Sequence, residues 1–177
     1  MSRRQKCTTS FELKNDFGCF FLDAVMNIIE FISADAVVPD FKASSKRQAL
    51  QILGRKAADI AGLEQHLVMD VLMERERLGS TGVGAGVAIP HGKVANLEKL
   101  YGVFGKTDEA IEFDSIDEQP VDLIFLLLAP DIAGADHLKA LSQISRVMSD
   151  SQMCGKLRKL NSRDDIFTVL TEAIDQK

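Results

Sequence analysis

Residues 121–129 read VDLIFLLLA, an apolar run that is interrupted only by Asp122 and ends before Pro130. A membrane-spanning helix needs about 20 apolar residues, so this run, the longest in the chain, is too short to cross a bilayer. Its length and continuity are typical of a central β-strand that is buried on both faces. We therefore expect a sheet with this strand at its centre and other elements packed on both sides.

Two helical patterns come before this strand. The first begins after Ser45, which forms a capping box with Gln48, and it runs to Gly62, where we expect the helix to end. The second covers about residues 64–77 and stops before Gly79. The predicted inward-facing residues are Ala49, Leu50, Leu53, Ala57 and Ile60 in the first helix and Leu67, Val68, Val71 and Leu72 in the second.

The remaining patterns complete the fold class. They predict strands at residues 87–89 and 100–106, a helix that opens at His137, and shorter helices near residues 151–160 and 163–174. Ser162 is placed to cap the last of these helices. The order of elements predicts an α/β fold in which a central mixed β-sheet is flanked by helices on both sides.

Length and charge limit the classes of protein to consider. The 177 residues, 46% of them hydrophobic, suffice for one buried core and are too few for two ordinary domains. A formal net charge of -5, with scattered Lys and Arg, argues against a nucleic-acid partner. We expect one domain at residues 26–177, preceded by residues 1–25 as a flexible extension or a start-site artefact.

The cysteines and histidines show no metal or disulfide spacing. Cys7, Cys19 and Cys154 are odd in number and lack the paired spacing of a zinc site or a disulfide framework, which favours a reducing, cytoplasmic setting. The three histidines also lack a ligand pattern on one element. We expect no metal, no cofactor, no export signal and no membrane insertion.

The glycine-rich run at residues 79–93, GSTGVGAGVAIPHGK, is the strongest functional signal. Its glycines let backbone N–H groups approach an anion, and Pro90 restricts the backbone just before His91. A dinucleotide fingerprint does not fit, because the run follows a helix and has the spacing G-x-G-x-G. A Walker loop does not fit either, because Val94 follows Gly92-Lys93. A plain glycine-rich turn, with His91 at a strand end, stays open on local chemistry alone.

The longer segment at residues 75–93, RERLGSTGVGAGVAIPHGK, closely resembles the active-site segment of the enzyme IIA domains of the mannitol and fructose class of the bacterial phosphotransferase system. The nitrogen-related enzyme IIA is the most similar type. In that family the histidine of the I-P-H-G segment accepts a phosphoryl group, on Nε2, from a histidine-containing phosphocarrier protein. The resemblance assigns this role to His91.

The resemblance also implies two supporting residues. Arg75 matches an arginine of the family motif, and its planar guanidinium suits a phosphoryl group. His137 matches the second histidine of the family's active site, which hydrogen-bonds the phosphoryl group or orients the first. On the sequence alone, Arg75 fits equally well as a solvated partner of a neighbouring Glu, and His137 as a capping or surface residue.

Further hydrogen-bond donors are expected in the glycine-rich run. Phosphoryl transfer between histidines depends on positioning and on donors to the phosphoryl oxygens. The hydroxyls of Ser80 and Thr81 and the backbone amides near Gly92 are the candidates. His66 has no comparable context and is expected at the surface.

The resemblance implies a phosphoryl carrier of the phosphoenolpyruvate-dependent phosphotransferase system. Nitrogen-related members usually stand alone, so we expect a regulator of nitrogen, carbon or potassium metabolism, read by transporters, sensor kinases or metabolic enzymes. One alternative is a sugar-specific enzyme IIA that passes phosphate to a fructose- or mannitol-type enzyme IIB. Another is a regulatory module that acts only by docking in its unphosphorylated form.

Overall fold

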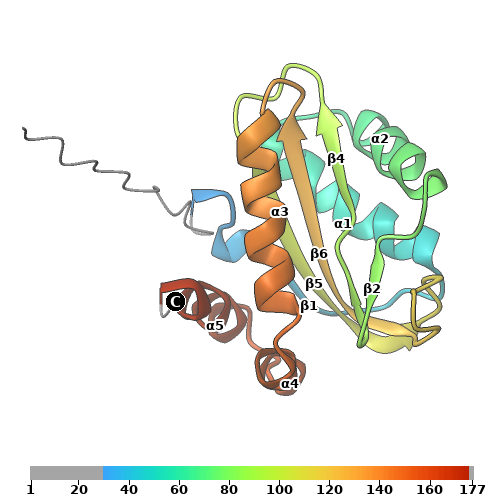
Figure 1. The fold of residues 1–177 in the computed structure, drawn as a ribbon, viewed down its shortest axis with the longest axis vertical. Helices are drawn as coiled ribbons and strands as arrows, with labels where there is room; N and C mark the ends of the chain where they lie inside the picture. The colour runs from blue at the N-terminus through green and yellow to red at the C-terminus, as the bar shows by residue number, and fades with distance from the viewer. Residues whose placement is uncertain (1–29, 176–177) are drawn as a thin grey trace, which may run out of the picture.

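The computed structural model describes residues 30–175, which form helices around a six-stranded sheet (Figure 1). The predicted extension at residues 1–25 lies outside the described residues. The strands are β1 (Val37–Phe41), β2 (Gly82–Gly84), β3 (Val87–Ala88), β4 (His91–Val94), β5 (Tyr101–Ile111) and β6 (Val121–Pro130). Their main order is β1-β5-β6-β3-β2, and β4 also pairs with β6.

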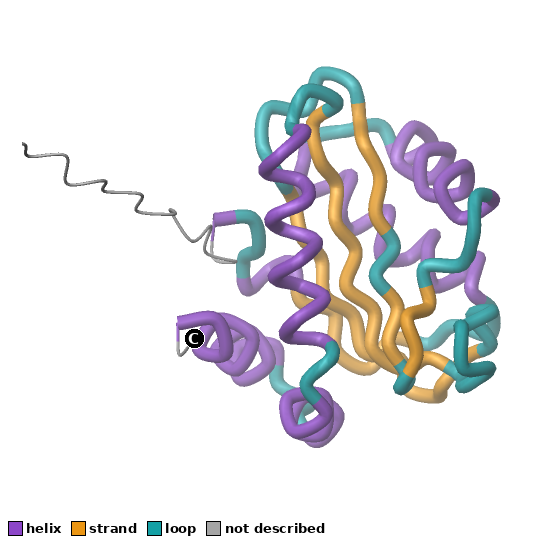
Figure 2. Tube along the Cα trace, in the orientation of Figure 1, coloured by secondary structure: helices purple, strands orange, loops and turns teal. Residues whose placement is uncertain are grey.

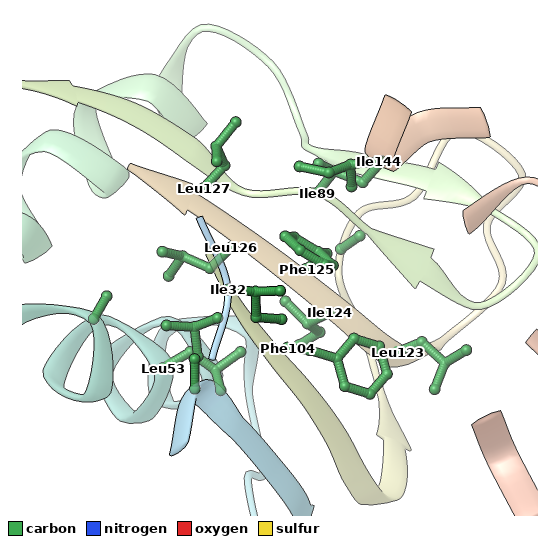
Figure 3. Close-up of a cluster of buried hydrophobic side chains, with 14 of the residues drawn as sticks. Ile32, Leu53, Ile89, Phe104, Leu123, Ile124, Phe125, Leu126, Leu127 and Ile144 are labelled. Carbon is green, nitrogen blue, oxygen red and sulfur yellow. The ribbon is translucent and has the colours of Figure 1, made fainter. Parts of the chain in front are cut away.

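Strand β6 is the centre of the sheet, as the apolar run predicts. It pairs antiparallel with β5 and parallel with β3 and β4, so the sheet is mixed. All of its residues except Asp122 are buried. In Figure 3, Leu126 points toward Leu53 on one side of the sheet, and Phe125 lies on the side of Ile144. The alternation of a strand thus places apolar side chains in the core on both faces.

Helices cover both faces of the sheet, which confirms the predicted fold class. In Figures 1 and 2, α3 (Gly134–Met148) lies in front of the strands and α1 (Lys46–Ala61) behind them. Helix α2 (Gln65–Arg77) packs on α1 and β4. Helices α4 (Ser151–Lys159) and α5 (Arg163–Asp175) pack against α3 and each other.

The predicted helix ends are confirmed at α1 and α5. The Ser45 hydroxyl accepts from the Gln48 amide at 3.3 Å, and Gly62 ends α1 with a left-handed φ of 68°. The reciprocal bond of the capping box is shifted by one residue, because the side-chain oxygen of Gln48 accepts from the Ser44 amide. The Ser162 hydroxyl accepts from the Asp165 amide at 3.4 Å.

Leu67, which the pattern placed on the inward face of the second helix, is at the surface with 45% exposure. In α3, the helix that the pattern opened at His137, Leu138 is 66% exposed. Helix α3 begins at Gly134, and its buried residues include His137, Ala140 and Ile144. The helical period then places His137, and not Leu138, on the buried face.

The glycine-rich run contains a hairpin that the patterns did not predict. Strand β2 turns back into β3 through Ala85 and Gly86, whose φ angles of 54° and 79° are left-handed. Asp117 accepts from the Ala85 amide, and Arg158 donates to the Ala85 carbonyl, so the turn is held from both sides. Strand β4 was also not predicted, because glycine and lysine have low strand propensity.

Candidate functional site

His91 is the first residue of β4, and both of its ring nitrogens are hydrogen-bonded. Nδ1 lies 2.9 Å from the Ile89 carbonyl. A carbonyl oxygen only accepts, so Nδ1 carries the proton. Nε2 accepts from Nε of Arg75 at 3.0 Å. The ring is therefore the neutral Nδ1–H tautomer, with the lone pair of Nε2 directed at the arginine.

Arg75 reaches this site from the last turn of α2. Besides His91, its Nη1 donates to the Gly79 carbonyl at 2.9 Å. Gly79 has a φ of 148°, a backbone conformation that favours glycine. Neither Glu74 nor Glu76 forms an ion pair with Arg75, so the alternative of a solvated arginine–glutamate pair is not what the structure contains.

His137 lies beside His91. It is in the first turns of α3 and is 8% exposed. The two ring centroids are 5.7 Å apart, with an angle of 54° between the planes. Within the described part of the chain, Nε2 of His137 is buried and has no hydrogen-bond partner. Three elements, α2, β4 and α3, thus bring Arg75, His91 and His137 together.

Both imidazoles favour the neutral form. Burial lowers the pKa of His91, the nearby Arg75 charge lowers it further, and the Ile89 hydrogen bond and Glu76 oppose this shift. Burial also lowers the pKa of His137, and the positive charges that His91 and Lys93 can carry add to the effect. A neutral imidazole has a free lone pair, so His91 is suited to nucleophilic attack near pH 7.

Ser80 and Thr81 use their hydroxyls to hold the loop. The Ser80 hydroxyl donates to the Phe113 carbonyl at 2.7 Å, and the Thr81 hydroxyl donates to the Glu76 carboxylate at 2.7 Å. Thr81 is 3% exposed. Both hydroxyl protons are committed to protein acceptors, which differs from the expected donation to a phosphoryl group.

Gly92 is required for packing. A Cβ added at this residue would lie 2.3 Å from Cγ1 of Val71 in α2. Only glycine lets α2 approach β4 this closely, and the approach brings the end of α2 to His91. This role is additional to the expected contribution of backbone amides near Gly92.

Sequence reasoning missed the part played by Glu76. Its side chain is only 5% exposed and forms an ion pair of 2.7 Å with Lys46. Its carboxylate also accepts from the Thr81 amide at 2.9 Å. A charge in the last turn of a helix resembles a solvated surface residue, and no local signal indicated a partner from α1.

The described residues contain no group of three or more His, Cys, Asp or Glu side chains that could hold a metal ion. His66 is exposed on α2, as expected. Among residues 30–175, none of the helices combines the length and apolar character that a membrane span requires.

Comparisons with known proteins relate this geometry to a family. A family model described as "Phosphoenolpyruvate-dependent sugar phosphotransferase system, EIIA 2" matches residues 30–173. A "Nitrogen regulatory protein" of Bradyrhizobium diazoefficiens is 50% identical over 145 residues, which are 82% of this chain and 95% of that relative. A "PTS system fructose-specific EIIA component" of Haloferax volcanii is 34% identical and covers 75% of this chain and 86% of that relative.

A solved structure has the same fold. The crystal structure of nitrogen regulatory protein IIA-Ntr from Neisseria meningitidis matches with a TM-score of 0.78 and 35% sequence identity. The match covers 81% of this chain and 99% of that one. The sheet and the helices on its two faces are therefore shared with a protein of this type.

Proposed function

This chain belongs to the EIIA 2 family of the phosphoenolpyruvate-dependent sugar phosphotransferase system, and on that basis we propose that it carries a phosphoryl group on Nε2 of His91. The donor is a histidine-containing phosphocarrier protein. The observation that supports this assignment most strongly is the pair of hydrogen bonds on the His91 ring. The membership predicted from residues 75–93 is confirmed. We assign the carrier function to residues 26–177.

The two hydrogen bonds select the attacking nitrogen. The Ile89 carbonyl keeps the proton on Nδ1, so Nε2 keeps its lone pair. This lone pair attacks the phosphorus of the carrier's phosphohistidine. The new P–N bond forms at Nε2 while the P–N bond of the carrier breaks, and the carrier's imidazole leaves with the electron pair. The same bond exchange in reverse returns the phosphoryl group or passes it on.

Arg75 and His137 hold the charge of the transferred group. The Nε–H of Arg75 that donates to Nε2 must release this nitrogen when the phosphorus arrives, and the guanidinium is then beside the phosphoryl oxygens. The unpartnered Nε2 of His137 belongs to the ring beside that of His91, where its N–H form can donate a hydrogen bond to one of these oxygens. Phosphoryl transfer relies on such positioning and charge stabilisation.

The proposed biological role is regulation. The relative that is 50% identical over 82% of this chain is named a nitrogen regulatory protein, and we propose the corresponding role here, in nitrogen, carbon or potassium control. The phosphorylation state is then read by transporters, sensor kinases or metabolic enzymes. This role places the protein in the cytoplasm with its phosphocarrier.

The direct test is phosphoryl labelling. The chain is incubated with phosphoenolpyruvate, the upstream phosphotransferase enzyme and the phosphocarrier, and the added phosphate is measured by mass spectrometry. We expect one acid-labile phosphate on the wild type and none on His91→Ala. His66→Ala is the matched control, because His66 is an exposed histidine of the same domain, and it should be labelled fully. Full labelling of His91→Ala would refute the assignment.

A sugar-specific enzyme IIA is the second candidate, since one relative is named a fructose-specific EIIA component. The phosphorylated chain is mixed with a fructose- or mannitol-type enzyme IIB, and the loss of phosphate from His91 is followed. A regulatory protein should transfer its phosphoryl group to enzyme IIB slowly, whereas a sugar-specific carrier should transfer it rapidly. The docking-only alternative predicts that the chain takes no phosphate and that the unphosphorylated wild type and His91→Ala bind a regulatory target equally tightly.

A further inference from the structure

Glu76 is a buried carboxylate at the end of α2, one residue after Arg75. One of its oxygens accepts from the Thr81 amide at 2.9 Å and forms the ion pair with Lys46 at 2.7 Å. The other oxygen accepts from the Thr81 hydroxyl at 2.7 Å. Glu76 therefore binds both the backbone and the side chain of Thr81. We call this contact the clamp, and it closes the chain between α2 and β2 into a tight loop.

Thr81 connects this clamp to one side of the His91 ring. The Thr81 carbonyl accepts from the Ile89 amide at 2.9 Å. The carbonyl of the same Ile89 accepts from Nδ1 of His91 at 2.9 Å. The group that fixes the tautomer of His91 is thus fixed by Thr81, which Glu76 holds.

The same loop connects the clamp to the other side of the ring. Gly79 lies inside the segment that the clamp closes, and its carbonyl accepts from Nη1 of Arg75. The guanidinium so held donates through Nε to Nε2 of His91. A loosened loop would therefore disturb the partners of both ring nitrogens.

We propose that Glu76 is a positioning residue of this site: by clamping Thr81, it holds the hydrogen-bond partners of both ring nitrogens of His91. Lys46 compensates the buried charge of Glu76 and completes the clamp. This role rests on the proposed function of His91. It differs from the role of Arg75, because Glu76 forms no hydrogen bond with His91 and holds the partners of the ring through Thr81 and Gly79.

The experiment is Glu76→Gln in the full chain, with two readouts. The first is ¹⁵N NMR of the histidine rings above their pKa, which reports the tautomer without any phosphate. We expect wild-type His91 as the Nδ1–H form and the variant as a mixture with the Nε2–H form. The second is the rate of phosphorylation by the phosphocarrier, which we expect to fall tenfold to a hundredfold, as for misplacements of about 1 Å.

Two control variants separate positioning from stability. Asp114→Asn removes the other carboxylate on Lys46, which is 83% exposed, and should leave both readouts unchanged. Lys106→Met removes a side chain that is 8% exposed and paired with Asp40. Lys106 is in register with Leu123 of β6, and His91 is in register with Leu127. Lys106 and His91 are therefore about 13 Å apart along the direction of β6. This variant should destabilise the fold and leave the His91 tautomer intact.

A second pair of variants tests the clamp while keeping the ion pair. Thr81→Val removes only the hydroxyl bond to Glu76, and Thr81→Ser keeps it. We expect partial tautomer mixing in the first and the wild-type tautomer in the second. This pair decides the proposal if Glu76→Gln does not fold.

The outcomes are distinguishable from those of the proposed function. If the wild type takes no phosphate, the proposed function fails, and the tautomer readout still decides the role of Glu76. If Glu76→Gln loses stability as Lys106→Met does, with an unchanged tautomer and rate, Glu76 is only structural and the proposal is overturned. A wild-type tautomer in Thr81→Val, when Glu76→Gln does not fold, overturns it as well.

Discussion

Gly92 offers the most direct test of how α2 is held against β4. An added Cβ lies 2.3 Å from Cγ1 of Val71, whereas packed carbon atoms prefer separations of about 3.5–4.0 Å. In Gly92→Ala, α2 and β4 must therefore move apart by about 1 Å, or the Val71 methyl must turn away. Turning is costly, because valine in a helix strongly prefers one χ1 rotamer.

The substitution is expected to lower both stability and transfer. Overpacking of this kind costs about 1–3 kcal/mol in the free energy of unfolding. For a domain of this size, each kcal/mol lowers Tm by about 2–4 °C. Arg75 is on the displaced helix, so its hydrogen bond to His91 lengthens. A misplacement of about 1 Å can slow such a reaction about a hundredfold.

The assay combines urea unfolding with the phosphorylation time course for Gly92→Ala, Val71→Ala and the double variant. The smaller residue makes room for the added methyl, so the two substitutions should compensate with a coupling free energy of about 0.5–3 kcal/mol. Gly155→Ala in α4 is the control, because its added Cβ meets no atom within 4 Å. It should be neutral or stabilising by up to about 1 kcal/mol. Wild-type stability and rate in Gly92→Ala would refute the packing argument.

Two further predictions concern the hairpin and the histidines. Ala85 has a φ of 54°, so Ala85→Gly should raise the free energy of unfolding in urea by about 0.5–1 kcal/mol, and a loss of stability would contradict this account of the turn. Burial lowers the pKa of His91 and His137 from 6.5, so below that pH the unfolded chain binds more protons than the folded one. The stability due to neutral imidazoles is therefore present above pH 6.5 and is lost as the pH falls through the folded pKa. His91→Asn/His137→Asn should flatten the fall in unfolding free energy between about pH 7 and 5, and an unchanged slope would contradict the assignment.

Much of the fold was predictable because its signals are local. The apolar run of β6, the Ser45 cap and the Gly62 stop each depend on residues within one element, and each is confirmed. Strands β2 and β4 were not predictable in the same way. They are rich in glycine, which has low strand propensity, and they form through pairing of β2 with β3 and of β4 with β6.

The same distinction between local and long-range signals applies to the residues of the candidate site. The motif at residues 75–93 pointed to His91 and Arg75, and the resemblance added His137, 46 positions further along the chain from His91. The uses of Ser80, Thr81 and Glu76 were not predictable, because their partners include the Phe113 carbonyl and Lys46, which are distant in the sequence.

By itself, the sequence determined that this chain forms an α/β domain of the EIIA 2 family and presents one histidine on a glycine-rich segment. Only the tertiary structure decided the tautomer of His91, because the tautomer depends on the Ile89 carbonyl and on Arg75 at the end of another element. It also decided that Glu76 is buried rather than solvated. Hydrogen bonds and burial act between atoms that are close in space, and sequence patterns report such distances only within a single helix or strand.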